Sequence, residues 1–171
     1  VGLDQTSEAE NFDRGTLRLP GVQEELIEAV VKAQPNTVVV LIHGGPLSSP
    51  VLRSDRLRAV LSAGYPGQLG GDAIVGALTG AFNPAGKLPM TWYTEAFTAR
   101  DIRETDLTRA GGVTHRYYDG PVLYPFGHGL SYTSFEYAWA PPSFAAAAAA
   151  RVSSSEGGDA SVVVTNTGRI H

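Results

Sequence analysis

The sequence of 171 residues contains no cysteine. It therefore has no disulfide bond, no thiolate nucleophile and none of the common structural zinc sites, because each of these needs cysteine sulfur. It also lacks any apolar run near the roughly 18 residues that a membrane-spanning helix requires. The 13 basic residues are outnumbered by 17 acidic ones and form no dense block. We therefore expect neither nucleic acid nor a membrane as a partner.

What the chain does contain is typical of a folded globular protein: 43% hydrophobic residues, 18% charged residues and a net charge of -4. Its length fits one ordinary domain, or one domain and part of another, since domains commonly run about 100 to 200 residues. The 20 glycines have no regular period, which excludes collagen, and the apolar content is too high for wholesale disorder. The polar, acidic first residues do not form a secretory signal segment.

The first half of the chain predicts alternating helices and strands. Apolar residues recur at helical spacing over residues 22–33, and Pro35 ends this amphipathic helix. Residues 37–42 form a continuous aliphatic run, typical of a strand buried on both faces of a parallel sheet. A second short strand is predicted at 58–63 and a second helix at 70–78. This order indicates an α/β layer architecture.

The second half is less regular. Residues 83–133 are rich in Gly, Pro and aromatic residues and predict packed loops and short strands; the aromatic side chains could stack on sugars, but packing into a core is commoner. Residues 138–158, with six consecutive alanines, are low in complexity and predict a linker. Residues 161–168 predict a strand that enters a turn. Because a lone strand cannot bury a face, we expect the chain to be a fragment of a larger protein.

An acidic cluster stands near the start of the chain, where Asp4, Glu8, Glu10 and Asp13 are followed directly by Arg14. Glycoside hydrolysis needs two carboxyl groups, one of them protonated to assist the departure of the leaving-group oxygen, and a nearby cation could tune such an acid. Charged loop residues are, however, usually just solvated. Taken alone, the cluster favours a solvated surface.

Other motifs argue against several kinds of chemistry. The loop at residues 43–46 follows a predicted buried strand, where α/β proteins place ligand loops, but it lacks the spacing of a phosphate-binding fingerprint, and its glycines favour a tight turn. A nucleophile elbow would need glycine at Thr133. His115 and His128 lack the spacing of a helical zinc pair, so a structural or substrate-facing role is favoured. We predict no metal site and no cofactor.

Several segments taken together resemble the second domain of glycoside hydrolase family 3, in particular its plant-type β-xylosidase and α-arabinofuranosidase branch. Three examples are Gly-Leu-Asp-Gln-Thr at 2–6, Gly-Tyr-Pro-Gly-Gln at 64–68 and Tyr-Pro-Phe-Gly-His-Gly-Leu-Ser-Tyr-Thr at 124–133. The matching text runs in the family's order over about three-quarters of the chain, at residues 2–6, 8–10, 13–14, 19–21, 44–46, 64–68 with 70–71, 83–93, 115–118 and 124–133.

The resemblance implies a domain plan. Residues 1–137 would form an N-terminally truncated three-layer α/β sandwich with a mainly parallel sheet, residues 138–158 a linker, and residues 159–171 the start of a fibronectin type III-like β-sandwich. The sequence departs from the family pattern in three places: Asn11 replaces a frequent glycine, residues 48–50 read Ser-Ser-Pro, and Ser62 stands where an aromatic residue is common. We therefore expect the loops near the sugar site to differ in geometry.

The resemblance also implies the chemistry. Glu8 takes the role of general acid/base in a retaining mechanism, and Glu10 is the fallback because this loop varies in length. The Asp nucleophile would lie on a preceding (β/α)₈ barrel of the same enzyme, which this sequence does not contain, so these residues alone are not expected to complete catalysis.

The implied enzyme is a secreted or cell-wall glycosidase that acts on oligosaccharides or cell-wall polysaccharides. Xylose, arabinose and glucose are the candidate sugars, in that order. The alternative is a non-catalytic carbohydrate-binding or structural module with the same fold.

Overall fold

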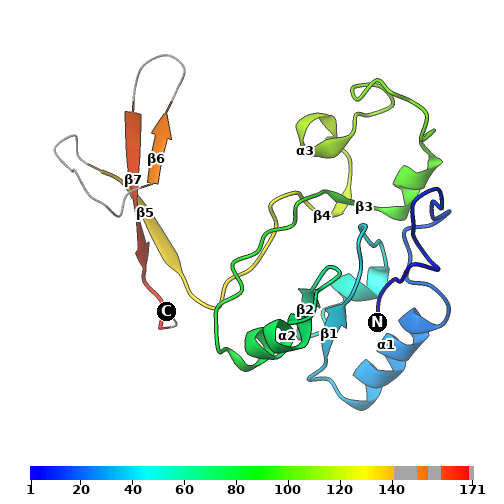
Figure 1. The fold of residues 1–171 in the computed structure, drawn as a ribbon, viewed down its shortest axis with the longest axis horizontal. Helices are drawn as coiled ribbons and strands as arrows, with labels where there is room; N and C mark the ends of the chain where they lie inside the picture. The colour runs from blue at the N-terminus through cyan, green and yellow to red at the C-terminus, as the bar shows by residue number, and fades with distance from the viewer. Residues whose placement is uncertain (141–149, 154–158, 170–171) are drawn as a thin grey trace. The chain divides into compact units, whose positions relative to one another are not determined.

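The computed structural model of the protein describes residues 1–140, 150–153 and 159–169. By its internal contacts the chain divides into two compact units (Figure 1). The first unit consists of Val1–Val75 and Gly86–Gly129, and the second of Gly76–Ala85 and the described residues of Leu130–His171. Both catalytic candidates of the sequence, Glu8 and Glu10, belong to the first unit.

The first half of the chain folds into the helices and strands that its sequence predicts. The elements are α1 (Gln23–Ala33), β1 (Val38–Leu41), η1 (Pro50–Arg53), β2 (Ala59–Ser62) and α2 (Gly70–Thr79). The predicted helices and strands are confirmed to within one residue at each end. β1 and β2 pair in parallel, from Val38 opposite Ala59 to Leu41 opposite Ser62. The amphipathic pattern of α1 places Ile27 in the core of this unit.

The prediction that the first strand is buried on both faces is wrong. Val39 and Leu41 of β1 lie in the core, whereas Val38 is 44% exposed and Val40 is half-buried. Within the described residues β2 is the one strand that pairs with β1. Ile42, the residue after β1, also forms an isolated bridge with Gly2. The sheet is therefore narrow, and its two faces are unequally covered.

A short antiparallel pair completes the first unit. β3 (Trp92–Tyr93) pairs with β4 (Val122–Tyr124), and the intervening chain forms η2 (Glu95–Ala99) and α3 (Thr114–Tyr117). Trp92 is 2% exposed and lies in the same hydrophobic cluster as Leu41 and Leu47. Packed loops and short strands are confirmed here. Of the aromatic residues in this half of the chain, Trp92 is in the core, whereas more than a third of the surface of Tyr117, Phe126, Tyr132 and Phe135 is exposed.

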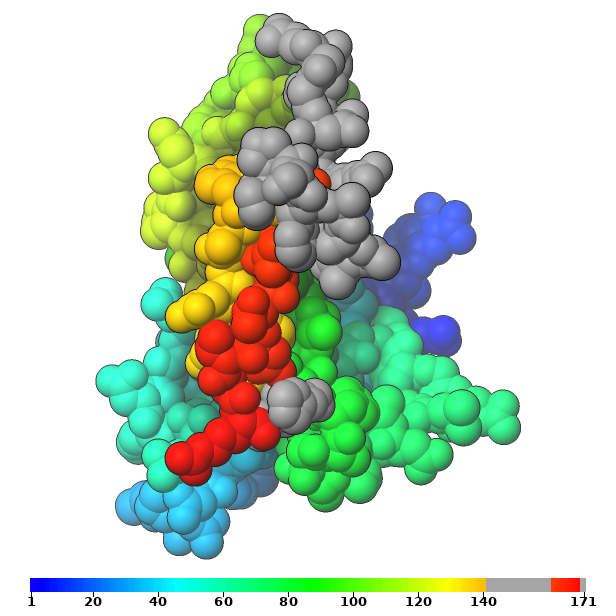
Figure 2. Space-filling model, turned by 90° about the vertical axis from the view of Figure 1, so that its left-hand side faces the viewer, coloured from blue at the N-terminus to red at the C-terminus, as the bar shows by residue number. Residues whose placement is uncertain are grey.

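The second unit contains a three-stranded antiparallel sheet in the order β5–β7–β6. β5 (Phe135–Trp139) and β6 (Ala150–Ser153) both pair with β7 (Asp159–Asn166), and Figure 2 shows β7, in red, beside β5, in yellow-orange. β7 is the strand that the sequence predicts near the end of the chain, but it has two neighbours. β5 crosses the predicted boundary at residue 137, and β6 lies inside the predicted linker, of which residues 141–149 and 154–158 are outside the described residues.

The sheets differ from a three-layer sandwich with a mainly parallel sheet. Among the described residues β1 and β2 form the one parallel pair, whereas the pairings of β3–β4 and β5–β7–β6 are antiparallel. A three-layer sandwich needs a wider sheet with helices on both faces. The described chain is an α/β fold of small sheets and helices. None of its helices in these ranges has the length and apolar character that crossing a membrane requires.

Candidate functional site

The candidate site lies at the carboxyl ends of β1 and β2. The N–H of Leu3 donates to the carbonyl of Ile42 over 2.8 Å, so the acidic opening of the chain runs past the end of β1. Residues 43–46 follow β1 directly, and Tyr65 follows β2. Three segments far apart in the sequence therefore meet at the edge where open α/β sheets bind ligands.

The Glu8 carboxylate is the point at which these segments meet. Its Oε1 accepts hydrogen bonds from the N–H of Gly44 over 2.7 Å, from the N–H of Gly45 over 3.1 Å and from the hydroxyl of Tyr65 over 2.7 Å. Its Oε2 accepts from Gly45 over 3.2 Å and lies 3.4 Å from Nε of Arg14. Successive backbone N–H groups form concavities that bind anions. The anion held here is a side chain of the same protein.

The two glycines allow this close approach. A Cβ atom on Gly44 would lie 2.8 Å from Glu8 Oε1 and 2.7 Å from Cε2 of Tyr65. A Cβ atom on Gly45 would lie 2.9 Å from Glu8 Oε2 and 2.9 Å from Nη2 of Arg14. Any side chain at either position would therefore displace the carboxylate from the two N–H groups. The tight-turn prediction for these glycines omitted this contact.

Arg14 links the carboxylate to the loop after β1. Besides its ion pair with Glu8, Nη2 donates to the carbonyl of Pro46 over 2.8 Å. Its Nη1 is buried and has no hydrogen-bond partner within the described residues. A buried charged donor without an acceptor is costly, so the site lacks one hydrogen-bond acceptor for this nitrogen.

The surroundings of Glu8 favour its charged form. Burial raises the pKa of the carboxyl group, but the hydrogen bonds from Tyr65, Gly44 and Gly45 and the charge of Arg14 lower it, and together they prevail. The net pKa lies below the ordinary value of 4.5. Glu8 is therefore ionised at neutral pH in this structure, which suits a base. A proton donor needs a higher pKa.

The His43 side chain is a part of the site that the sequence analysis did not identify. The residue is 5% exposed, its Nδ1 lies 2.8 Å from the carbonyl oxygen of Gly45, and its Nε2 lies 2.8 Å from Oγ of Ser62. Burial lowers the pKa of His43; the Gly45 contact and the charge of Glu8 act in the opposite direction, and Arg14 lowers it further. The one signal in the sequence was Ser62, a small residue where the family commonly has an aromatic one.

The fallback candidate, Glu10, lies outside this arrangement. It is exposed and makes no hydrogen bond or ion pair with any described residue. The backbone groups of Ala9 and Phe12 hydrogen-bond to each other over 3.0 and 3.3 Å, which closes a tight turn around Glu10. Asn11 has φ 63°, a conformation that glycine and asparagine adopt at low cost. The asparagine that replaces a common family glycine therefore preserves the turn.

The other two carboxyl groups of the acidic cluster do not join Glu8. Asp4 Oδ1 accepts hydrogen bonds from the hydroxyl and the N–H of Thr6 over 2.6 and 3.0 Å, which lower its pKa. Asp13 is exposed and has no hydrogen-bond or ionic partner among the described residues. The solvated-surface interpretation of the cluster therefore holds for these two residues.

The two later histidines pack against aromatic rings. His115 stacks on Phe126 with ring centroids 4.0 Å apart, and His128 stacks on Tyr124 at 5.0 Å. In the part of the chain that the structure describes, no group of three or more His, Asp or Glu side chains could hold a metal ion.

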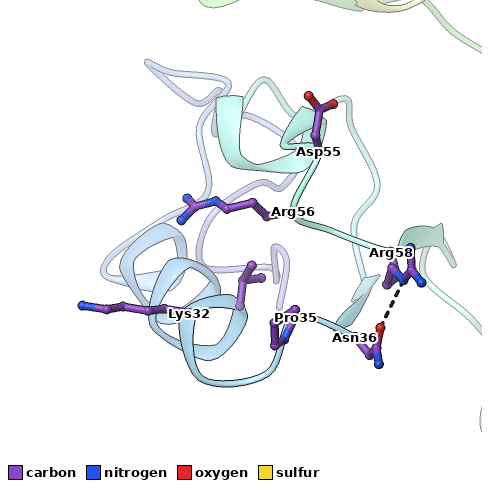
Figure 3. A pocket seen from close by; sticks show the side chains of 7 residues that line it. Lys32, Pro35, Asn36, Asp55, Arg56 and Arg58 are labelled. Carbon is purple, nitrogen blue, oxygen red and sulfur yellow. Dashed lines mark hydrogen bonds between the residues drawn. The ribbon is translucent and has the colours of Figure 1, made fainter.

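A hollow of about 520 Å³ lies at the opposite ends of the two parallel strands, where Asn36 precedes β1 and Arg58 precedes β2. Its charged lining residues are Lys32, Asp55, Arg56 and Arg58. Figure 3 shows that the charged ends of Lys32 and Arg58 point apart, and that Arg58 is held by Asn36, whose Oδ1 accepts from its Nε over 3.1 Å. These side chains do not converge on one ligand position.

Residues 1–132 match the family model described as the glycosyl hydrolase family 3 C-terminal domain. The chain belongs to glycosyl hydrolase family 3. The match contains every residue that contacts Glu8, together with His43 and Ser62.

Known members of glycosyl hydrolase family 3 are similar to this chain in sequence and in structure. Beta-D-xylosidase 1 of Arabidopsis thaliana is 47% identical over 146 residues, which are 82% of this chain and 19% of that protein. A solved exo-β-xylosidase of the family, in complex with a xylobiose aziridine probe, superposes with a TM-score of 0.76 at 36% identity, over 80% of this chain and 19% of the other.

A third similar protein has another sugar in its solved structure. The β-glucosidase of Kluyveromyces marxianus in complex with glucose superposes with a TM-score of 0.77 at 32% identity, over 98% of this chain and 20% of that one. The chain thus spans about a fifth of the length of the relatives that it matches. These relatives are glycosidases of which this chain corresponds to one part.

Proposed function

We propose that this chain is part of a retaining, exo-acting glycoside hydrolase that releases xylose, or arabinose, from xylan-type oligosaccharides, and that it supplies the general acid/base. The observation that carries this proposal is the Glu8 carboxylate, held at the ligand-binding edge of a parallel pair by Gly44, Gly45, Tyr65 and Arg14. The 47% identity to beta-D-xylosidase 1 of Arabidopsis thaliana supports xylose over glucose.

In a retaining mechanism one carboxyl group does two jobs in turn. It first donates a proton to the departing oxygen, and it then removes a proton from the water that hydrolyses the glycosyl-enzyme intermediate. Glu8 is ionised in this structure and so has the form that the second step needs. For the first step its pKa has to rise. Removal of water by a bound sugar and an adjoining domain would raise it, because burial disfavours the charged form.

The nucleophile of this mechanism is an Asp on a (β/α)₈ barrel outside this sequence. The acid/base and the nucleophile of a retaining enzyme stand about 5 to 5.5 Å apart, so the barrel must reach the carboxyl ends of β1 and β2. Glu10, one turn further along the loop, is the fallback for the acid/base. It is exposed and has no hydrogen-bond or ionic partner among the described residues.

The proposal includes the surroundings of this site. The β1–β2 pair, within residues 1–137, would be part of an N-terminally truncated three-layer α/β sandwich, and residues 159–171 would begin a fibronectin type III-like domain after a linker. The enzyme would act outside the cell or in the cell wall, where its oligosaccharide or polysaccharide substrate occurs.

The full-length protein that contains this chain tests the proposed reaction. Its kcat/KM should be highest on an aryl β-D-xyloside, lower on an α-L-arabinofuranoside and lowest on a β-D-glucoside, and the β-anomer of xylose should be the first product. The separate 171-residue chain serves as the control and should hydrolyse none of them. A full-length protein that binds xylo-oligosaccharides but hydrolyses no glycoside would instead establish the non-catalytic module.

A further inference from the structure

The loop that holds Glu8 is itself held by a side chain. His43 is the first residue after Ile42, and its backbone N–H donates to the carbonyl of Gly64 over 3.1 Å, which ties it to the end of β2. Its ring then turns back onto its own loop, where Nδ1 lies 2.8 Å from the Gly45 oxygen. The ring also packs edge-on against Trp92, with centroids 5.0 Å apart. The backbone and the ring of His43 are therefore both fixed.

The hydrogen-bond partners define the tautomer of this ring. A carbonyl oxygen only accepts, so Nδ1 must carry the proton that it shares with Gly45. In the neutral ring Nε2 is then an acceptor, and it accepts from the hydroxyl of Ser62. The charged groups that face the ring are Glu8 and Arg14, and Trp92 on β3 presents no charge. A small hydroxyl residue at 62 fits this arrangement.

Gly44 and Gly45 need an external constraint because glycine has more backbone freedom than any other residue. The hydrogen bond from Nδ1 fixes the Gly45 carbonyl, and Arg14 fixes the carbonyl of Pro46 that follows. With both carbonyls held, the preceding N–H groups of Gly44 and Gly45 remain aimed at Glu8.

We propose that His43 is a positioning residue for Glu8: through its Nδ1–H bond to Gly45 it holds the two glycine N–H groups on the carboxylate, with Ser62 fixing the tautomer. We call this hydrogen bond from His43 to Gly45 the His43 clamp. Its effect on hydrolysis rests on the proposed function. The clamp itself does not, because it acts on the ionisation of Glu8 in the chain described here.

Nuclear magnetic resonance on the 171-residue chain tests the clamp without any substrate. In the wild type, ¹⁵N shifts should identify the Nδ1–H tautomer of His43, and the amide signals of Gly44 and Gly45 should titrate together with the ¹³C signal of the Glu8 carboxyl group. The Nε2–H tautomer in the wild type would overturn the proposal before any variant is made.

Two substitutions distinguish the effect of the hydrogen bond from the effect of the volume that the ring fills. His43→Leu removes the donor, so the Glu8 titration should move up toward 4.5 and the Gly45 amide should exchange with solvent about tenfold faster, the size expected for one lost hydrogen bond. His43→Asn places a side-chain N–H near the position of Nδ1 and should restore both signals. A folded His43→Leu chain with an unchanged Glu8 titration would overturn the proposal, as would equal losses in the two variants.

The full-length enzyme supplies the catalytic arm. His43→Leu should lower kcat on xylosides with poor leaving groups by more than it raises KM, because the Glu8 carboxyl group loses its fixed position, and this loss outweighs the gain in its protonated form. His43→Asn should recover most of the loss. If Glu8 proves not to be the acid/base, these rates will not change, but the carboxyl titration in the 171-residue chain still will. Failure of the clamp and failure of the proposed function are thus distinguishable.

Discussion

Tyr65 donates its hydroxyl hydrogen to Oε1 of Glu8 over 2.7 Å, the same oxygen that the N–H of Gly44 reaches over 2.7 Å. One donor comes from the loop after β2 and the other from the loop after β1, and these strands are neighbours in a parallel sheet. The carboxylate therefore joins two strand ends. Half of the Tyr65 surface stays exposed.

Removal of the Tyr65 hydroxyl should raise the pKa of Glu8. The hydrogen bond from Tyr65 is the largest of the effects that favour its charged form, whereas burial, which favours the neutral form, stays nearly unchanged in Tyr65→Phe. The measurement is a ¹³C titration of the Glu8 carboxyl group. Tyr117→Phe is the matched control, because Tyr117 is exposed and far along the chain. Equal titrations of Glu8 in both variants would contradict the account.

A methyl group on Gly44 should damage the site, whereas one on Gly67 should not. In Gly44→Ala the new Cβ atom meets Glu8 Oε1 at 2.8 Å, and we expect a loss of about 1 to 3 kcal/mol in the free energy of unfolding, as in other overpacked sites. A Cβ atom on Gly67 meets nothing within 4 Å, so Gly67→Ala should stay within about 0.5 kcal/mol of the wild type. Urea unfolding gives both values, and a larger loss at Gly67 would refute this role of Gly44.

The pKa of His43 predicts how stability depends on pH. Burial lowers this pKa from the ordinary value of 6.5, so His43 binds a proton more readily in the unfolded chain than in the folded one. The stability that neutral His43 contributes is complete above pH 6.5 and is lost as the pH falls through the lower pKa of the folded state.

Unfolding in urea at a series of pH values tests this sign. Asparagine does not titrate, so the free energy of unfolding of the wild type should fall more steeply between about pH 7 and pH 5 than that of His43→Asn. Parallel profiles for the two proteins would show that His43 has the same proton affinity in the folded and unfolded chains, contrary to the account.

Substitution of each of the two tryptophans by alanine should have very different effects on the free energy of unfolding. Trp92 is 2% exposed and packs against His43 and Tyr124, so Trp92→Ala should cost about 3 to 5 kcal/mol of stability. Trp139 on β5 is 75% exposed, and Trp139→Ala should change stability by less than about 0.5 kcal/mol. Calorimetric or urea unfolding of the two variants provides the comparison. Similar losses would contradict the placement of Trp92 in the core.

Local patterns of the sequence predict the elements of the first half well, because apolar spacing reports directly on which face of α1 or β1 is buried. They do not predict the sheet of β5, β6 and β7, because β6 lies in the low-complexity segment whose composition predicts a linker. They also predict the wrong burial for Val38. This residue lies in an aliphatic run typical of a buried strand, but it is 44% exposed because the sheet is narrow.

The sequence likewise predicts one part of the candidate site and misses the other. The acidic cluster and the family motifs point to Glu8, but its hydrogen-bond donors are Gly44, Gly45 and Tyr65, at least 36 residues away. Only the fold brings these donors to one oxygen. The sequence predicts a turn at the glycines of this loop and does not identify His43, because its ring contacts the backbone of Gly45, which leaves no side-chain signature in the sequence.

The central claim is that Glu8 supplies the proton for the leaving group, and the dependence of rate on the leaving group tests it most directly. The measurement is kcat/KM of full-length Glu8→Gln and Glu10→Gln enzymes on aryl xylosides that span a range of phenol acidities. Glu8→Gln should abolish hydrolysis of xylosides with poor leaving groups and largely spare the first chemical step on the most activated ones, because an activated phenolate departs without protonation. Glu10→Gln should follow the wild type across the series. Unchanged rates in Glu8→Gln, with the steep dependence in Glu10→Gln instead, would contradict the account and assign the acid/base to Glu10.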